Sequence, residues 1–314
     1  MIAINAPFST IFRFDIRNMA SLVKFGVSFS PAGLLTPFHV GASARLRSLG
    51  FIHDDIALSG SSGGALAAIS SALSLSPEKT MEASLYVAQE CRDKGARLTL
   101  RTSLETVLDS LLPKDCYIEL NQRPQPCTVG YRELSTNKYV LQSEPKFVKQ
   151  YQSKADVIEV LLASCNIPFY FNGNSVTTSV RGSQGIDGFF SVDLKRFGCP
   201  PTDATLQEVL VCPYPTNLVG LDPKKLRVDS NASNTCNYDI ISPDLLDSST
   251  WPYSLWDLLR MSLTAPASTL NPDKPISNAE LQDKYQELYH TGYEAASRWY
   301  EQKVLFLQMQ KIPK

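Results

Sequence analysis

A serine set between glycines is the residue in this chain whose surroundings first suggest chemistry. Gly60-Ser61-Ser62-Gly63-Gly64 matches the pattern Gly-x-Ser-x-Gly, in which a sharp turn between a strand and a helix makes the serine hydroxyl project from the backbone. Glycines suit that turn because it crowds its neighbours and strains the serine backbone. The N–H groups of the following helix would face any negative charge that forms beside the serine. We predict Ser62 as a nucleophile and Gly60 and Gly64 as its turn; the alternative is a plain glycine-serine turn.

The flanking sequence supplies the strand and the helix that such a turn requires. Residues 56–58 predict a short buried strand, and residues 65–75 predict an apolar helix after the turn. Earlier in the chain, residues 22–30 predict a strand, residues 31–33 a loop, and residues 36–50 a helix with Thr36 as its N-cap, Pro37 at its first position and Gly50 at its end. Strand, turn and helix therefore occur twice in succession. This order predicts an α/β fold with a parallel or mixed sheet covered on both faces.

The rest of the chain continues as one domain. Helices are predicted at 78–94, 100–112, 155–164 and 278–311, a possible hairpin between 127 and 143, a buried strand at 206–212, and a long surface excursion at 213–252. We find no internal repeat and no low-complexity linker, so we expect a single domain over residues 22–310. Residues 1–21 are expected to be a leader of uncertain order, whose composition faintly resembles an organelle-transit segment.

Composition narrows the class of partner. The chain has 314 residues, 43% of them hydrophobic, and 30 basic against 31 acidic side chains, which gives no excess charge for binding nucleic acid. Its seven cysteines are scattered without metal-binding spacing, so we expect buried free thiols in a reducing compartment and no metal site. No apolar run is long enough to span a membrane. We expect an intracellular protein, cytoplasmic or peripherally bound to a membrane, whose oligomeric state is unknown.

Four further blocks of sequence resemble the patatin-like phospholipases. Residues 29–41 (FSPAGLLTPFHVG) are similar to the loop and helix that follow the first strand of that family, with Phe38-His39-Val40-Gly41 at the place of a Tyr-His-x-Gly-Val-like stretch. Residues 162–171 are similar to its Ala-Ser-x-x-x-Pro segment, and Ile186-Asp187-Gly188 matches its Asp-Gly-Gly/Ala motif. Residues 292–296 look like its closing helix. Together with the serine turn, these blocks follow the family's order over about residues 22–300.

The resemblance implies a fold and a reaction. The fold would be three-layered, α/β/α, around a central, mostly parallel sheet. Asp187 would form a Ser-Asp dyad with Ser62 and deprotonate it, giving an acyl-enzyme that water hydrolyses. Backbone N–H groups of Ala32, Gly33 and Gly63 would form the oxyanion hole, with no metal or organic cofactor. The substrates would be fatty-acyl esters of phospholipids, galactolipids or acylglycerols, reached at a membrane or lipid-droplet surface.

Two residues depart from the family pattern. Pro31 stands where the oxyanion loop usually has its first glycine and has no N–H, so the donors would come from Ala32, Gly33 or Leu34. Loss of one such donor costs about 3 kcal/mol of transition-state stabilisation. A catalytically weak lipid-binding or scaffold protein is therefore an alternative, and a lipid acyltransferase is another. Phe189 stands where many relatives have a small residue, and would either narrow the entrance or reach toward an acyl chain.

Histidine offers a different base, and the C-terminal segment a different partner. Ser62, Asp187 and His290 occur in the order of a hydrolase triad. However, His290 lies in a helical pattern, and we favour the dyad because a triad histidine usually lies on a loop. His39 is expected to pack or hydrogen-bond within the first helix. The amphipathic residues 297–311 either pack on the core, which we favour, or lie on a lipid surface.

Overall fold

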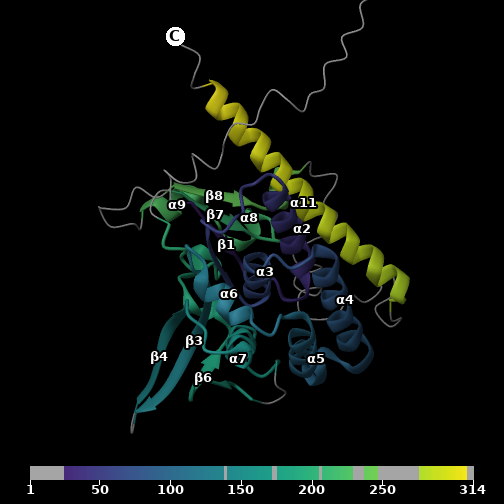
Figure 1. The fold of residues 1–314 in the computed structure, drawn as a ribbon, viewed down its shortest axis with the longest axis vertical. Helices are drawn as coiled ribbons and strands as arrows, with labels where there is room; N and C mark the ends of the chain where they lie inside the picture. Colours follow the sequence, from purple (N-terminus) through teal and green to yellow (C-terminus); the bar gives the residue numbers. More distant parts are fainter. Residues whose placement is uncertain are drawn as a thin grey trace, which may run out of the picture.

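A mixed sheet of eight strands forms the centre of the molecule in this computed structural model (Figure 1). The structure describes residues 25–137, 140–171, 175–204, 207–228, 237–246 and 276–309. The strand order is β5-β6-β3-β2-β1-β7-β8, and β4 pairs with β3. The strands are β1 (Phe25–Phe29), β2 (Ala57–Ser61), β3 (Cys127–Asn137), β4 (Val140–Val148), β5 (Thr178–Val180), β6 (Ser183–Ile186), β7 (Gln207–Val211) and β8 (Asn237–Ile241).

The strands that carry the site residues are parallel neighbours. β3, β2, β1, β7 and β8 pair in parallel, whereas β4 and β6 pair antiparallel with β3, and β5 with β6. Phe29, near the end of β1, is in register with Gly60 of β2 and Val211 of β7. The loops that leave these strands therefore meet at one edge of the sheet, which is where open α/β sheets bind ligands.

Helices follow the strands in the predicted alternation. They are α2 (Thr36–Ser48), α3 (Gly63–Ala72), α4 (Pro77–Lys94), α5 (Ala96–Leu111), α6 (Cys116–Gln122), α7 (Lys154–Ser164), α8 (Thr216–Val219), α9 (Pro223–Val228) and α11 (Asn278–Met309), with short 3-10 helices η1 (Gly33–Leu35), η2 (Gly188–Ser191), η3 (Leu194–Arg196) and η4 (Pro243–Leu245). The predicted strands at 22–30, 56–58 and 206–212, the hairpin and the four long helices are confirmed within a few residues at their ends. One detail differs: Thr36 begins α2 and donates its hydroxyl to Gly33 O at 2.7 Å, so it does not cap the helix.

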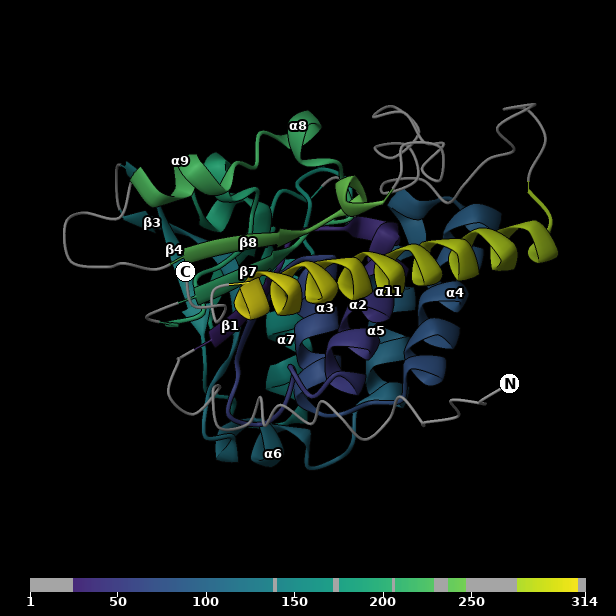
Figure 2. The ribbon, with the colours of Figure 1, turned by 90° about the horizontal axis from the view of Figure 1, so that it is seen from above.

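Large apolar side chains cover one face of the sheet. Val27, Leu58, Val129 and Val209 belong to a buried cluster that also takes in residues of α2, α3, α5, α7 and α11. The long helix α11 crosses α2 and α4 on the outside of this layer (Figures 1 and 2). Glycine makes the α2–α11 approach possible, because a Cβ at Gly41 would lie 1.9 Å from Tyr289 O.

The opposite face of the sheet carries small residues, and the segment around Pro200 and Thr202 lies directly on it. The Ser28 and Ser59 hydroxyls both donate to Pro200 O at 2.7 Å, and a Cβ at Gly26 would lie 1.9 Å from Thr202 Oγ1. η3, α8 and α9 complete this thinner outer layer together with a small apolar cluster around Leu210. The three-layer α/β/α expectation is confirmed, with parallel strands from β3 to the edge strand β8 and antiparallel strands at the other side of the sheet.

The predicted surface excursion at 213–252 is wrong in part. Within it, β8 extends the sheet as a parallel neighbour of β7. The sequence pattern does not predict this strand because, among the described strands, β8 pairs with β7 alone and has a polar centre: Asp239 pairs with Lys303 at 2.6 Å and accepts a hydrogen bond from Gln207. The short strands β5 and β6 and helix α6 were likewise not predicted.

The predictions for the two ends of the chain have different outcomes. The expected leader, residues 1–21, lies outside the described residues. Near the other end, Trp299 is buried and packs edge-on against Phe51 with ring centroids 5.0 Å apart, as the core interpretation of this segment predicts. The side chains from residue 304 onward are outside the described part. Among the helices that are described, none has the length and apolarity needed to cross a membrane.

Candidate active site

Ser62 stands at the junction of β2 and α3 in a strained conformation. Its φ of 52° and ψ of −131° are unusual for a residue with a side chain. The tight turn leaves no room beside it: a Cβ at Gly60 would lie 2.2 Å from Gly64 O, and one at Gly64 would lie 2.3 Å from Ser30 O. Glycine is therefore required at both predicted positions. The turn places Ser62 at the N-terminus of α3, on the edge of the sheet where β1 also ends.

A buried serine from another helix holds the Ser62 backbone in place. The Ser62 N–H donates to Ser164 Oγ at 2.9 Å, and the Ser164 hydroxyl donates to Gly130 O at 2.6 Å. Ser164 is the last residue of α7, and Gly130 lies in β3. Three elements thus converge on the peptide that carries the candidate nucleophile.

Asp187 follows β6 and is held by its neighbours on both sides. Its N–H donates to Asn166 O at 2.9 Å, and Asn166 Nδ2 donates in turn to Gly185 O at 3.2 Å. Its own Oδ1 accepts a hydrogen bond from Phe189 N–H at 2.8 Å. The residue is 2% exposed, so the carboxyl is removed from water.

Burial raises the pKa of Asp187 to about 7, while the Phe189 N–H and the adjacent Ser62 hydroxyl oppose the rise by stabilising the ionised form. The two predicted dyad residues, 125 positions apart in the sequence, therefore lie side by side. Asp187 Oδ2 is buried and accepts no hydrogen bond from the described residues. A carboxylate with a pKa near neutrality and a free oxygen next to a hydroxyl has the properties of a general base.

Two of the three predicted oxyanion-hole residues meet beside Ser62. A Cβ at Gly63 would lie 3.0 Å from Gly33 N, so these glycines are in direct contact, and both line the same cavity as Ser62. In the part of the chain that the structure describes, neither N–H donates a hydrogen bond. Ala32 is placed differently: its methyl group packs in the cluster around Leu210, and Leu34 takes the neighbouring position on the cavity wall.

The two departures from the family pattern lie together, away from the cavity. Pro31 packs against Gly198, where a Cβ would lie 2.5 Å from the proline ring. Phe189 packs edge-on against Phe190 and Phe197, with centroids 5.4 and 5.6 Å apart, and is not among the cavity-lining residues. Phe189 therefore neither narrows the cavity nor reaches into it.

The histidines form no contact with the candidate dyad. The fully buried His39 donates Nε2–H to Ser30 O at 2.8 Å, outside its own helix, and burial lowers its pKa to about 4. His290 is exposed on α11 and packs against Tyr289 with ring centroids 5.6 Å apart. Over the described residues, no three His, Cys, Asp or Glu side chains gather as a metal site would require. The six described cysteines are free and buried.

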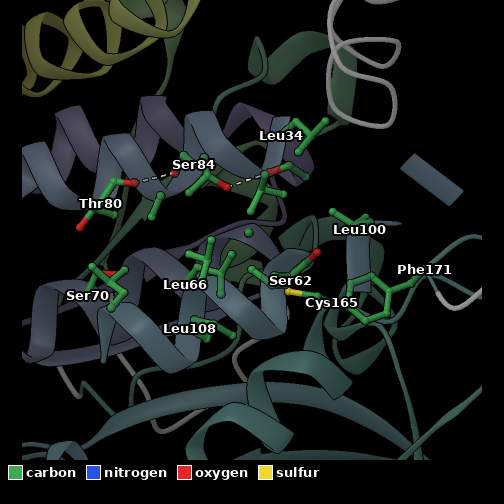
Figure 3. A pocket seen from close by; sticks show the side chains of 18 of the residues that line it. Leu34, Ser62, Leu66, Ser70, Thr80, Ser84, Leu100, Leu108, Cys165 and Phe171 are labelled. Carbon is green, nitrogen blue, oxygen red and sulfur yellow. Dashed lines mark hydrogen bonds between the residues drawn. The ribbon is translucent and has the colours of Figure 1, made fainter. Parts of the chain in front are cut away.

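A narrow cavity of about 80 Å³ opens from Ser62 between α3, α4 and α5 (Figure 3). Its walls are mainly apolar: Leu34, Leu66, Ala83, Val87, Leu100, Leu104, Val107, Leu108, Leu111, Ile167 and Phe171, with Tyr285 from α11. Thr80 and Ser84 also line it, but their hydroxyls donate to Ser76 O and Thr80 O within or just before α4. Such a lining suits an aliphatic chain.

Sequence reasoning missed several residues of the site. Ser164, Cys165 and Asn166 belong to the segment that resembles the family, but only the structure shows that they hold Ser62 and Asp187. Cys165 lies beside the Ser62 hydroxyl (Figure 3), and burial together with the nearby Asp187 raises the pKa of its thiol well above the usual value. The walls contributed by α4 and α5 had no sequence signal beyond ordinary amphipathic helices.

Comparison with known proteins identifies the family. A family model described as patatin-like phospholipase matches residues 27–194, which is more than half of the chain. The chain belongs to the patatin-like phospholipase family. The match includes the turn at Ser62, the segment at Ser164 and the loop at Asp187, so the elements that converge in the structure are those the family shares.

Individual relatives are distant. The human patatin-like phospholipase domain-containing protein 4 is 28% identical over 172 residues, covering 52% of this chain and 63% of its own. The 1-acylglycerol-3-phosphate O-acyltransferase Pnpla3 of Mus musculus is 25% identical over 52% of this chain and 39% of its own, and human PNPLA3 is 26% identical over 64% and 42%. The chain thus spans less than two thirds of these relatives. Among solved structures, VipD from Legionella pneumophila aligns with a TM-score of 0.41 and 12% identity over 88% of this chain and 66% of its own.

Proposed function

We propose that this protein is a lipid acyl hydrolase that cleaves fatty-acyl esters of glycerolipids through Ser62 and Asp187. One observation carries the proposal: a buried carboxyl, whose pKa is raised to about 7, adjoins the hydroxyl of a strained serine at the mouth of an apolar cavity. Membership of the patatin-like phospholipase family supports the same reaction class.

The residues present allow a complete two-step reaction. Asp187 accepts the Ser62 proton as Ser62 Oγ attacks the ester carbonyl, and the N–H groups of Gly33 and Gly63 stabilise the oxyanion. Protonated Asp187 then gives its proton to the leaving alcohol, and an acyl-enzyme remains. Water attacks this ester with Asp187 again as base, which releases the fatty acid and restores Ser62. Ala32 N–H remains a further candidate donor.

The cavity supports a fatty-acyl group as the part of the substrate that is recognised. Its apolar lining begins at Ser62 and Gly63 and continues along Leu66 and α5. Each methylene buried there contributes about 0.8 kcal/mol. An acyl chain would therefore lie along α3 with its carbonyl at Ser62, whereas a polar head group would remain outside.

Exposed apolar residues support peripheral contact with a lipid surface. Phe169, Phe190 and Leu194 are 60%, 42% and 68% exposed. Phe169 lies between the cavity residues Ile167 and Phe171, and Phe190 and Leu194 lie in η2 and η3, which follow Asp187 in the chain. We expect the protein to sediment with phosphatidylcholine vesicles, and replacement of Phe169 and Leu194 by Ser to weaken this binding at least threefold. Binding that survives the double replacement would locate the contact elsewhere.

Labelling with a fluorescent fluorophosphonate tests the nucleophile. Wild type is expected to be labelled and to hydrolyse acyl esters, whereas Ser62→Ala should do neither. Asp187→Asn should lower kcat/KM by at least 10³-fold, and wild-type kcat/KM should rise with pH to a plateau above about pH 7, because Asp187 must be ionised to act. Labelling that persists in Ser62→Ala would refute Ser62. Absence of labelling and turnover in wild type would favour the lipid-binding or scaffold alternative.

Acyl transfer is the second candidate, because two of the relatives are named as acyltransferases. It would use the same acyl-enzyme and differ in the alcohol that resolves it. Hydrolysis predicts free fatty acid as the main product even with excess lysophosphatidic acid. Acylated acceptor as the main product would establish transfer instead.

A further inference from the structure

Tyr285 of α11 forms a wall shared by two hollows. One is the cavity beside Ser62, and the other is a groove of about 290 Å³ between α4 and α11, here called the α4–α11 groove. The groove is lined by Pro77, Glu78, Met81, Glu82, Leu85, Gln282, Tyr285, Gln286 and Tyr289. Among these described residues, Tyr285 is the one that also lines the Ser62 cavity.

The helix α4 presents a different stripe to each hollow. Thr80, Ala83, Ser84 and Val87 face the Ser62 cavity, whereas Glu78, Met81, Glu82 and Leu85 face the groove. These positions recur at intervals of three and four, so each set forms one side of the helix. The Tyr285 side chain packs between them in a cluster with Met81 and Ala88. A single side chain thus stands where the two stripes meet.

The closed position of Tyr285 leaves its hydroxyl unsatisfied. The residue is 2% exposed, and its Oη is buried without a hydrogen-bond partner among the described residues. Burial also raises the pKa of Tyr285. A buried hydroxyl without a partner is unfavourable. Rotation of the ring toward the groove would hydrate that hydroxyl and would join the two hollows.

We propose that Tyr285 is a side-chain gate that sets the length of acyl chain the Ser62 cavity accepts. This inference rests on the proposed function and names a specificity-determining residue for it. Short chains fit with the ring closed. Longer chains displace the ring, and the hydroxyl that gains water partly offsets the loss of ring packing, so the chain end continues into the α4–α11 groove.

Binding of free fatty acids to the Ser62→Ala protein tests the gate without requiring turnover. Dissociation constants for octanoate, dodecanoate and stearate are measured by calorimetry. Each further methylene that enters an open channel should tighten binding by about fourfold, and a closed ring should reduce that gain for the longest chain. The replacement Tyr285→Leu, introduced into the Ser62→Ala protein, removes the obstruction. It should tighten stearate binding at least tenfold relative to octanoate binding.

Two matched variants separate a gate from a fixed wall. Tyr285→Phe keeps the ring but removes the unsatisfied hydroxyl, so it should favour the closed position. It should weaken stearate binding relative to octanoate binding at least threefold and raise the midpoint of thermal unfolding. Tyr293→Leu, about two turns along α11, lines neither hollow and should leave the ratio of stearate to octanoate affinity unchanged.

The outcomes are distinct. If Tyr285→Phe leaves the ratio of the stearate and octanoate dissociation constants unchanged, Tyr285 is a fixed wall and the gate is overturned. If Tyr285→Leu leaves this ratio unchanged, Tyr285 has no role in selecting chain length. Fatty-acid binding without esterase activity in wild type would leave the gate standing and overturn the proposed hydrolysis. If none of the three acids binds, the gate is overturned, while labelling and turnover of wild type decide the proposed hydrolysis separately.

Discussion

At the scale of single residues, strain and burial are concentrated at the two positions proposed to react. Ser62 adopts a positive φ, and Asp187 is a carboxyl almost without solvent contact. Both arrangements are unfavourable for folding, since a strained non-glycine backbone and a buried ionisable group each destabilise the native state. Neither is needed to build the sheet. Their combination is therefore better explained by reactivity than by stability.

The strain at Ser62 gives the first prediction. Ser62→Gly removes the side chain that disfavours φ 52°, and we expect the free energy of unfolding to rise by about 1 kcal/mol after the greater chain entropy of glycine is subtracted. Ser62→Ala keeps Cβ and loses the same hydroxyl, so it is the matched control and should show no such gain. Both are expected to be inactive. Urea unfolding that finds the two variants equally stable would contradict backbone strain at this position.

At the scale of elements, the site depends on three segments that are brought together by the end of α7. Ser164 accepts the Ser62 N–H and donates to Gly130 of β3, and Asn166 accepts the Asp187 N–H. The nucleophile and the base are thus positioned by one short segment. Because α7 packs against both β3 and β6, its end fixes the distance between residues that the sequence separates widely.

The second prediction concerns Ser164. Ser164→Ala leaves the Ser62 N–H and Gly130 O without their partner, so we expect the free energy of unfolding to fall by about 1–3 kcal/mol and kcat to fall at least tenfold because Ser62 is no longer held.

Ser59→Ala is the control for Ser164→Ala. Ser59 is equally buried, but its hydroxyl donates to Pro200 O on the other face of the sheet. It should lose comparable stability with kcat unchanged. An equal loss of kcat in both variants would mean that Ser164 acts through general stability alone.

The sequence predicts the elements with local signals and misses those without them. β1, β2 and their following helices were predictable because apolar runs are punctuated by glycine and proline, and Ser62 because its turn requires glycine at fixed spacing. β5 and β6 are three and four residues long, too short for a periodic pattern. The role of α4 and α5 was not predictable, because an apolar helix face looks the same whether it meets a core or a cavity. The identity of Asp187 came from family resemblance; its raised pKa depends on burial, which only the fold creates.

At the scale of the whole molecule, two buried groups titrate in opposite directions. Burial raises the pKa of Asp187 to about 7 and lowers that of His39 to about 4. The folded state therefore binds the Asp187 proton more tightly than the unfolded chain does, so this contribution stabilises the fold as the pH falls from about 7 toward 4. For His39 the sign is reversed, because the unfolded imidazole takes up a proton below about pH 6.5 and the folded one resists it.

The third prediction follows from this opposition. Between pH 7.5 and 4.5, Asp187 should add ~3 kcal/mol to the free energy of unfolding and His39 should remove ~2–3 kcal/mol, so these two contributions oppose each other in wild type. Asp187→Asn keeps the shape of the side chain but no longer titrates. Its stability should therefore fall with acid by ~3 kcal/mol more than that of wild type over this range, which urea unfolding at several pH values measures.

Comparing the two proteins at each pH removes the contribution of every other titrating group they share. Parallel stability curves would mean that the folded pKa of Asp187 is ordinary, and the same result would remove the raised pKa from the argument that Asp187 is the base. A divergence of the expected sign should coincide with the pH at which wild-type kcat/KM falls, because one protonation event would both stabilise the fold and disable the reaction. The two titrations then report on one carboxyl, one through stability and the other through rate.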